Sequence, residues 1–289
     1  MTSQSLRLAT RGSPLAMRQT ELTLEWLREH LPETEFSVHE MVTTGDKQKQ
    51  WSLEQRGGEG LFVKELEEAL RSGQADVAVH SAKDLPAVQP DDLEIAGYLP
   101  RAEVNDVLVV REDIATPCFI ATSSPRRRAQ LKALYPCAVW SEIRGNVETR
   151  LKKVANGKVD ATILAAAGLR RLGHFEWPGL AFRPFSPAQV IPAAGQGAIA
   201  LQVRKGEGEA LRAVLDEETG YAVETEKAVL AGMGGGCHTS IGVYCYNRNV
   251  SVYYEPVGTR HYQMRGNGDA RERVVAEIVK DLGLSEDSE

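Results

Sequence analysis

The sequence predicts an α/β fold in which two similar, hinged α/β domains precede a small α+β domain. Three observations favour this fold. Two pairs of segments repeat one another in the first two thirds of the chain, and short apolar runs alternate there with amphipathic runs of helical length. After the glycines at 234–236, apolar and polar residues alternate and a last amphipathic run follows. The change of pattern marks the third domain.

The first repeat pairs "LRLATRGSPLAMRQTELTLEWL" (6–27) with "FIATSSPRRRAQLKAL" (119–134). Each reads as a short strand, a polar turn and a helix. Ser13 and Ser124 fit N-cap positions, and each is followed by a proline that suits the first helical position. Each turn therefore places a helix N-terminus, a natural anion site, at the carboxyl end of a strand.

The second repeat pairs "EALRSGQADVAVHSAKDL" (68–85) with "KKVANGKVDATILAAAGL" (152–169). Both predict a helix, a turn, an apolar strand and a polar or small-residue tip. Alternating strands and helices predict parallel sheets, and the duplication predicts two domains of the periplasmic-binding-protein type with a ligand between them. The chain is expected to cross near 99–101 and 185–192 and to return as a strand in 192–204.

The predicted domain boundaries follow from these segments. Domain 1 comprises 1–99 with 190–214, domain 2 comprises 100–189, and domain 3 comprises 215–289. In domain 3 we expect a helix from about Glu217 to Ala231, antiparallel strands from Ile241 and a closing helix in "DARERVVAEIVKDLGL". The tail "SEDSE" is expected to be disordered.

One cysteine stands directly behind the glycines, in "GMGGGCHTSIG" (232–242). Glycine allows unusual backbone angles and close approach of a ligand, at a cost in conformational entropy. Cys237 is then either a small buried side chain in a tight turn or an accessible sulfur for covalent chemistry. A zinc site of Cys237, His238 and Cys245 is a third reading, but its spacing matches no common ligand pattern, and no metal is expected.

Composition restricts the class of protein. The 289 residues carry a formal net charge of −6, which argues against a general nucleic-acid binder, so any anion binding must be local. No run of eighteen apolar residues occurs, and the start "MTSQSLRLAT" lacks the features of a signal or transit peptide. We therefore expect a cytoplasmic protein without a membrane partner. The four cysteines include no C-x-x-C pair and are expected to be free thiols.

Arginines gather at the predicted strand-to-helix junctions, where ligands of open α/β sheets bind. They are Arg11, Arg126, Arg127, Arg128, Arg144, Arg150, Arg170 and Arg171. Any one of them is typical of a solvated surface. Together they predict a cleft that binds a polyanion, because guanidinium groups bind carboxylates and phosphates through two parallel hydrogen bonds.

The segment "VAVHSAKDLP" ends an apolar strand with Ser81, Lys83 and Asp84. Lys83 and Asp84 are either a surface ion pair or part of the cleft. In a cationic cleft Asp84 would stay ionised and would stabilise positive charge developing on a substrate. His80 is expected to be a strand residue without a catalytic role.

Nine segments, in order from about residue 6 to 242, give the chain a family resemblance: "LATRGSPLAMRQTE", "MVTTGDK", "GLFVKELEEAL", "DVAVHSAKDLP", "ATSSPRRRAQL", "RGNVETRL", "ILAAAGLRRLG", "PAAGQGA" and "GGGCHTSIG". The sequence resembles the hydroxymethylbilane synthase family, also called porphobilinogen deaminases. The resemblance implies an enzyme that removes ammonia from porphobilinogen and joins four units into a linear tetrapyrrole, on a dipyrromethane primer held by a thioether.

The resemblance also implies a role for each matching residue. Asp84, with Lys83, matches the catalytic position and would stabilise the cation left when ammonia departs. The thioether cysteine matches Cys237. The other primer-binding residues implied are Ser13, Ser81, Lys83, Thr122, Ser124, Arg126, Arg127, Arg144 and Gly145. The substrate-binding residues implied are Arg11, Gln19, Phe62, Arg150 and Arg171. The small-molecule substrate would be the only partner of a monomer.

The chain departs from the family pattern at two residues and in one segment. Glu59 stands in "GGEG" where the family commonly has lysine, His238 stands where glutamine is frequent, and "KQKQWSLEQ" (47–55) is more polar than usual. Two other functions stay open from the residues: a hinged protein that binds a small anion without chemistry, and an inactive paralogue. Cys237 and Asp84 argue against the first, and Glu59 is the reason for the second.

Overall fold

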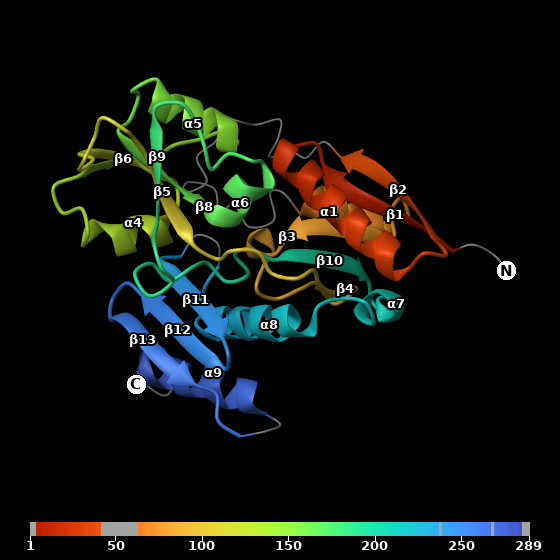
Figure 1. The fold of residues 1–289 in the computed structure, drawn as a ribbon. Helices are drawn as coiled ribbons and strands as arrows, with labels where there is room; N and C mark the ends of the chain where they lie inside the picture. The colour runs from red at the N-terminus through yellow and green to blue at the C-terminus, as the bar shows by residue number, and fades with distance from the viewer. Residues whose placement is uncertain (1–3, 42–62, 237–238, 267–268, 285–289) are drawn as a thin grey trace.

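The computed structural model describes residues 4–41, 63–236, 239–266 and 269–284. They form three sheets, drawn in Figure 1 as a first sheet in red, orange and teal, a second in yellow and green, and a third in blue. The second sheet lies beside the first, and the third lies below both.

Sheet 1 has the strand order β2-β1-β3-β10-β4. Its strands are β1 (Gln4–Arg11), β2 (Thr34–Met41), β3 (Val77–Ser81), β4 (Leu93–Tyr98) and β10 (Ile199–Arg204). Its helices are α1 (Pro14–His30), α3 (Lys64–Arg71) and the short 3₁₀ helix η1 (Ala82–Asp84). Successive residues of a strand face opposite sides, so Leu8 packs with Leu27 of α1 while Ala9 packs with Leu66 of α3.

Sheet 2 repeats this plan in the order β7-β6-β8-β5-β9. Its strands are β5 (Asp106–Arg111), β6 (Phe119–Ala121), β7 (Val139–Ser141), β8 (Ala161–Ala165) and β9 (Leu180–Pro184). Its helices are α4 (Pro125–Lys132), α5 (Val147–Ala155) and α6 (Ala166–Arg171). Both faces of β5 are buried, which explains its unbroken apolar run.

The two sheets confirm both sequence repeats. β1 and α1 correspond to β6 and α4, and α3, β3 and η1 correspond to α5, β8 and α6. The expectation of purely parallel sheets is wrong for one central strand in each sheet. β10 runs antiparallel to β3 and β4, and β5 runs antiparallel to β8 and β9, because each of these strands enters its sheet from the other half of the chain.

Two crossover segments join the sheets, 99–105 on the way out and 185–198 on the way back. They touch each other, since Ala102 N donates to Gly197 O at 3.2 Å. Gly197 has a φ of +89°, and a Cβ there would lie 2.5 Å from Ala102 O. Gly195 has a φ of +78° and would place a Cβ 3.0–3.1 Å from the backbone of Ala82 and Lys83. The glycines of "PAAGQGA" therefore allow the return crossover to lie against the end of β3.

The C-terminal region contains α7 (Glu209–Arg212), α8 (Glu217–Gly232), the antiparallel strands β11 (Ile241–Tyr246), β12 (Asn249–Tyr254) and β13 (Gly258–Gln263), and α9 (Ala270–Asp281). The predicted helix, strands and closing helix are confirmed. α7 packs on sheet 1 through Leu211, whereas buried side chains of α8, the third sheet and α9, Val229, Val243 and Ile278 among them, form one core.

The glycine run ends α8. Gly234 has a φ of +63°, and its N–H donates to Ala231 O, while the N–H of Gly235 donates to Leu230 O. These two bonds form a Schellman motif, which satisfies the last carbonyls of the helix. A Cβ on Gly235 would lie 2.6 Å from the Ile241 side chain. At least two of the glycines thus serve the tight turn between α8 and β11.

Candidate active site

Two helix N-termini form the framework of the site. The Ser13 Oγ caps α1 by accepting from Ala16 N at 3.3 Å, and the Ser124 Oγ caps α4 by accepting from Arg127 N at 3.4 Å. A proline follows each cap, as the sequence predicts. Thr122, buried at the end of β6, shapes the second turn because its Oγ1 accepts from Ser124 N at 3.2 Å. The two turns are built alike.

The end of β3 supplies the acidic side of the site. Buried Gln19 of α1 donates from Nε2 to Ser81 Oγ at 2.9 Å, so these two predicted site residues touch each other. Lys83 and Asp84 follow in η1, with Lys83 half-buried and Asp84 exposed. Burial lowers the pKa of Lys83 to about 8, against the opposing effect of the Asp84 charge.

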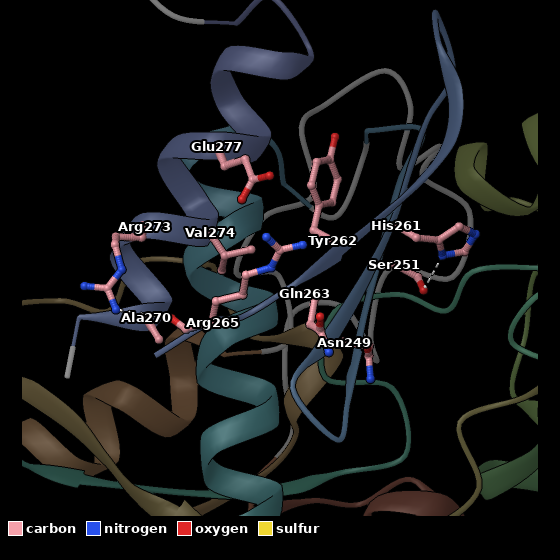
Figure 2. A pocket seen from close by; sticks show the side chains of 10 residues that line it. All are labelled: Asn249, Ser251, His261, Tyr262, Gln263, Arg265, Ala270, Arg273, Val274 and Glu277. Carbon is pink, nitrogen blue, oxygen red and sulfur yellow. Dashed lines mark hydrogen bonds between the residues drawn. The ribbon is translucent and has the colours of Figure 1, made fainter. Parts of the chain in front are cut away.

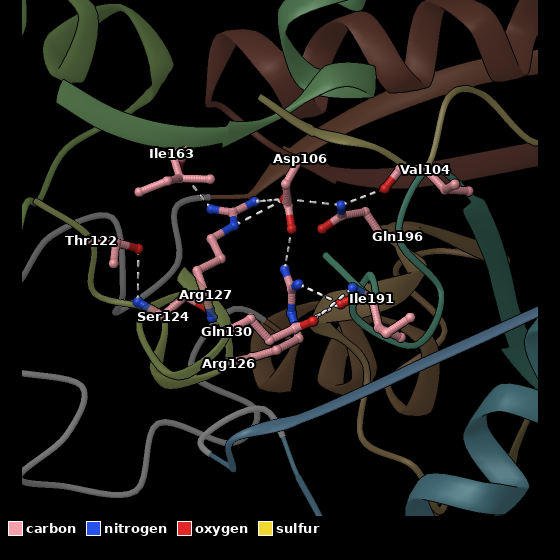
Figure 3. Close-up of polar contacts among 10 residues, drawn as sticks. All are labelled: Val104, Asp106, Thr122, Ser124, Arg126, Arg127, Gln130, Ile163, Ile191 and Gln196. Carbon is pink, nitrogen blue, oxygen red and sulfur yellow. Dashed lines mark hydrogen bonds and ion pairs between the residues drawn. The ribbon is translucent and has the colours of Figure 1, made fainter. Parts of the chain in front are cut away.

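Arg126 and Arg127 of α4 converge on one buried carboxylate, Asp106 (Figure 3). Arg126 Nη2 donates to Oδ2 of Asp106 at 2.7 Å, and Arg127 donates from Nε and Nη2 to Oδ1 at 3.0 and 2.7 Å. Burial alone would raise the pKa of Asp106, but the two arginines more than reverse this and hold it below its ordinary value. Burial lowers the pKa of Arg126, with Asp106 opposing.

The segment from β7 to α5 supplies two more arginines. Arg144 and Arg150 are half-buried, and Arg150 Nε donates to the carbonyl of Gly145 at 2.8 Å. Gly145 has a φ of +112°, which favours glycine at this turn. Burial lowers the pKa of Arg150 to about 10, and the charges of Arg127 and Arg144 lower it further.

The two halves of the molecule meet at these groups. The Asp84 charge raises the pKa of Arg150, and the charges of Arg126 and Arg127 lower the pKa of Lys83 while Asp106 raises it. Side chains from the carboxyl ends of both sheets therefore act on one another electrostatically. The cations of this group outnumber its carboxylates, Asp84 and Asp106, so the half-buried site favours an anionic ligand.

Arg11 and Arg171, two more predicted site residues, have other neighbours. Arg11 is half-buried at the end of β1, and its charge contributes to the lowered pKa of His80, which burial chiefly brings to about 4. Buried His80 bonds Gln202 at 3.0 Å, in keeping with a strand residue. Arg171 Nη2 donates to Gly197 O at 2.6 Å. Arg171 thus lies against the return crossover. Burial lowers its pKa to about 10, and the charge of Glu103 opposes this change.

Several predictions concern residues outside the described part of the chain. These are Cys237, His238, Phe62, Glu59, the segment 47–55 and the tail 285–289. Cys245, by contrast, is buried in the C-terminal core, and burial raises the pKa of its thiol to about 12. The described residues contain no group of three or more His, Cys, Asp or Glu suited to a metal ion.

A cavity of about 620 Å³ lies elsewhere, between the third sheet and α9 (Figure 2). Ser251, His261, Arg265, Arg273 and Glu277 are among its lining residues. None of them belongs to the predicted site, and the arginine group described above is the better candidate because it unites charge, burial and both sheets. Among the described helices, none is long and apolar enough to cross a membrane.

Sequence reasoning missed Asp106 and Gln196. Gln196 lies fully buried in the return crossover, and its Nε2 donates to Val104 O at 2.6 Å and to Asp106 Oδ1 at 3.1 Å. An aspartate just before the apolar run "VLVV" was a signal for Asp106, since a charge at the start of a buried strand requires a partner. The only sequence signal for Gln196 was its position between two glycines.

Comparisons with known proteins place the chain in a family. The model of the family "Porphobilinogen deaminase, dipyromethane cofactor binding domain" matches residues 6–212. Porphobilinogen deaminase of Thiobacillus denitrificans is 40% identical over 298 residues, covering 98% of this chain and 96% of that protein. The enzyme of Syntrophobacter fumaroxidans is 40% identical over 254 residues, covering 85% and 81%.

Among solved structures, the periplasmic VFT2 domain of BvgS from Bordetella pertussis aligns with a TM-score of 0.44 and 20% identity, covering 78% of this chain and 90% of that one. The match of the family model to most of the chain, and 40% identity along nearly all of it, settle the family. The chain belongs to the porphobilinogen deaminase family.

Proposed function

We propose that this protein is a hydroxymethylbilane synthase, a transferase that joins four porphobilinogen molecules into a linear tetrapyrrole on a dipyrromethane attached to Cys237. The observation that supports it most strongly, beside the family match, is the electrostatic interaction of Lys83 and Asp84 from one half with Arg127 and Arg150 from the other. Such a surplus of half-buried cations fits a ligand rich in carboxylates.

The residues present fit the dipyrromethane group. Arg126, Arg127 and Arg144, with Lys83 opposite, would hold its carboxylates, and the turns at Ser13 and Ser124 would present backbone N–H groups. When bound, the group supplies the pyrrole carbon to which the first substrate unit is joined. Arg11 and Arg150 are proposed to orient the carboxylates of the incoming porphobilinogen, together with Gln19, Phe62 and Arg171.

Asp84 has the central role in the proposed chemistry. In each addition the C–N bond of the substrate's aminomethyl group breaks and ammonia leaves. A C–C bond then forms between the remaining methylene carbon and the free ring carbon of the pyrrole at the end of the growing chain, and that ring carbon loses a proton. Positive charge develops on the substrate pyrrole as ammonia leaves. An exposed carboxylate at the edge of a cationic site stabilises that charge without having to donate a proton.

The proposal includes the three-domain division given above, with the sheets as the cores of the first two domains and the third carrying Cys237. It also includes a monomeric enzyme in the cytoplasm, without a nucleic-acid or membrane partner. Light scattering on the purified protein tests the monomer, and a dimer at micromolar concentration would contradict it.

Intact-mass measurement tests the covalent group. The purified protein is expected to exceed its sequence mass by one dipyrrole, and Cys237→Ser should lack the excess. Cys118→Ser is the matched control, because Cys118 is an exposed free thiol outside the site and its loss should leave the excess in place. An unmodified protein that still releases ammonia from porphobilinogen would overturn the proposed attachment.

Ammonia release separates the enzyme from the other readings. A small-anion-binding protein would bind porphobilinogen without releasing ammonia. An inactive paralogue would neither bind porphobilinogen well nor release ammonia at a useful rate. Because Glu59 motivates the paralogue, Glu59→Lys is the informative variant. A gain of about a hundredfold, equivalent to about 2.7 kcal/mol, would favour the paralogue over the active enzyme.

A further inference from the structure

Asp106 is a carboxylate that the proposed chemistry does not use. It is the first residue of β5, it is completely buried, and its two oxygens serve different arginines. Oδ2 accepts from Arg126, while Oδ1 accepts from Arg127 through both Nε and Nη2. Each oxygen therefore fixes the direction of one guanidinium group (Figure 3).

Other partners restrict the same two arginines. Arg126 Nη1 donates to Ile191 O at 2.7 Å, in the return crossover, and Arg127 Nη1 donates to Ile163 O at 2.9 Å, in β8. Each guanidinium is thus held at two edges, by Asp106 and by a backbone carbonyl. A planar group held at two edges has little freedom to turn.

Gln196 joins this arrangement to both crossovers. Gln196 lies in the return crossover. Its Nε2 donates to Asp106 Oδ1 at 3.1 Å and to Val104 O, in the outgoing crossover, at 2.6 Å. Arg101, also in the outgoing crossover, donates from Nε to Gln196 O at 3.0 Å. The position of Asp106 is therefore tied to the two segments that connect the sheets.

We propose that Asp106 is a positioning residue for the proposed reaction, fixing the guanidinium groups of Arg126 and Arg127 relative to the crossovers through Gln196. This inference rests on the proposed function, since it assumes that the two arginines hold the anionic primer. A negative charge near Arg126 and Arg127 is not sufficient for this role, because the position of the Asp106 carboxylate sets the direction of both guanidinium groups. A displacement of about 1 Å in such a site lowers turnover by as much as about a hundredfold.

Asp106→Glu separates position from charge. The variant keeps the negative charge and moves it by one methylene group. We expect a folded protein whose primer-bearing fraction has a kcat lower by about tenfold or more, with KM changed by less than about threefold because the charge is retained. A purely structural carboxylate would lower the melting temperature and the yield but leave the kcat of that fraction unchanged.

Asp76→Glu is the matched control. Asp76 also lies between two arginines, accepting from Arg7 at 2.9 Å and from Arg204 at 3.2 Å. It precedes β3 at the end of the strand opposite to Lys83. We expect a kcat within about twofold of the parental value, since Arg7 and Arg204, the arginines that Asp76 contacts, are not part of the proposed site.

Gln196→Met provides a second test that leaves both ion pairs of Asp106 intact. It should fold, and the kcat of its primer-bearing fraction should fall by about threefold or more, because the link between the crossovers and Asp106 is lost. The inference is overturned if the folded, primer-bearing Asp106→Glu and Gln196→Met proteins both turn over within about twofold of the parental rate. If the parental chain carries no primer and releases no ammonia, the proposed function itself has failed.

Discussion

The two five-stranded sheets share one plan and differ in the side chains that they carry. β1 in sheet 1 and β6 in sheet 2 each lead into a helix that begins with a capping serine and a proline. Ala16 and Arg127 occupy equivalent places because each donates its N–H to the capping serine. The next position back is Leu15 in α1 and Arg126 in α4. The repeated backbone thus sets where side chains stand, and the side chains decide that α4 carries two arginines where α1 has Leu15 and Ala16.

A second difference appears at the ends of β3 and β8. β3 leads into Lys83 and Asp84 in η1, whereas β8 leads into the small buried residues Ala166, Ala167 and Gly168 of α6. A Cβ on Gly168 would lie 3.6 Å from the Leu15 side chain, so this tip is a packing surface against α1. Under the proposed function one tip of the repeat carries the catalytic acid, while the other packs against α1.

The largest expected effect comes from removing Asp84, the exposed acid of η1, which has no counterpart in the equivalent helix α6. Asp84→Asn should lower kcat by about a hundredfold or more, because the developing positive charge loses its partner. The variant should keep its primer and its stability within about 0.5 kcal/mol, since Asp84 is exposed. Asp91→Asn, an exposed aspartate nearby, is the control. Near-normal turnover of Asp84→Asn would remove the proposed role.

The second prediction uses the lysine of the same tip. The ammonium of Lys83 has a pKa lowered to about 8, so it loses its charge as the pH rises through that value. If the charge binds a carboxylate, kcat/KM should fall above a midpoint at or above pH 8, because bound carboxylates raise this pKa. Lys83→Arg should move the decline to higher pH. An unchanged profile in this variant would assign the decline to another group.

The third prediction concerns the cationic half. Arg150→Lys should lower the rate of elongation by about tenfold if Arg150 holds a carboxylate through two hydrogen bonds, because lysine offers only a point charge. Partly extended enzyme should then accumulate and be visible by intact mass. Arg170→Lys is the control, since Arg170 is an exposed arginine paired with Glu103 at 2.8 Å. Equal rates in both variants would contradict the two-bond contact.

The smallest expected effect tests what the two halves share. Ser13→Ala and Ser124→Ala each remove one N-cap, which should cost about 1 kcal/mol of unfolding free energy in either half. Chemical denaturation of the primer-free protein measures both. A cost near zero for one cap would show that the two turns are not equivalent, despite their matching geometry.

The sequence by itself determined much of this protein because its signals are local. Three kinds of signal act within a few positions of the chain: serine-proline caps, glycines at helix C-termini and the period of apolar residues. Both repeats, α8, the third sheet and α9 could therefore be predicted from the sequence. Nine ordered motifs also indicated the family. The places of Lys83 and Asp84 could be predicted because they directly follow the apolar strand β3, and those of Arg126 and Arg127 because they follow a serine-proline cap.

Only the tertiary structure decided the direction of β5 and β10 and the partners of the buried charges. An antiparallel strand arriving from the other half has no local signature, since its apolar run is the same in either direction. Asp106 meets Arg126 and Arg127 across about twenty positions and Gln196 across ninety. Such pairings depend on the path of the two crossovers. That path is possible because Gly195 and Gly197 carry no Cβ where the return crossover lies against the distant backbones of Ala82 and Ala102.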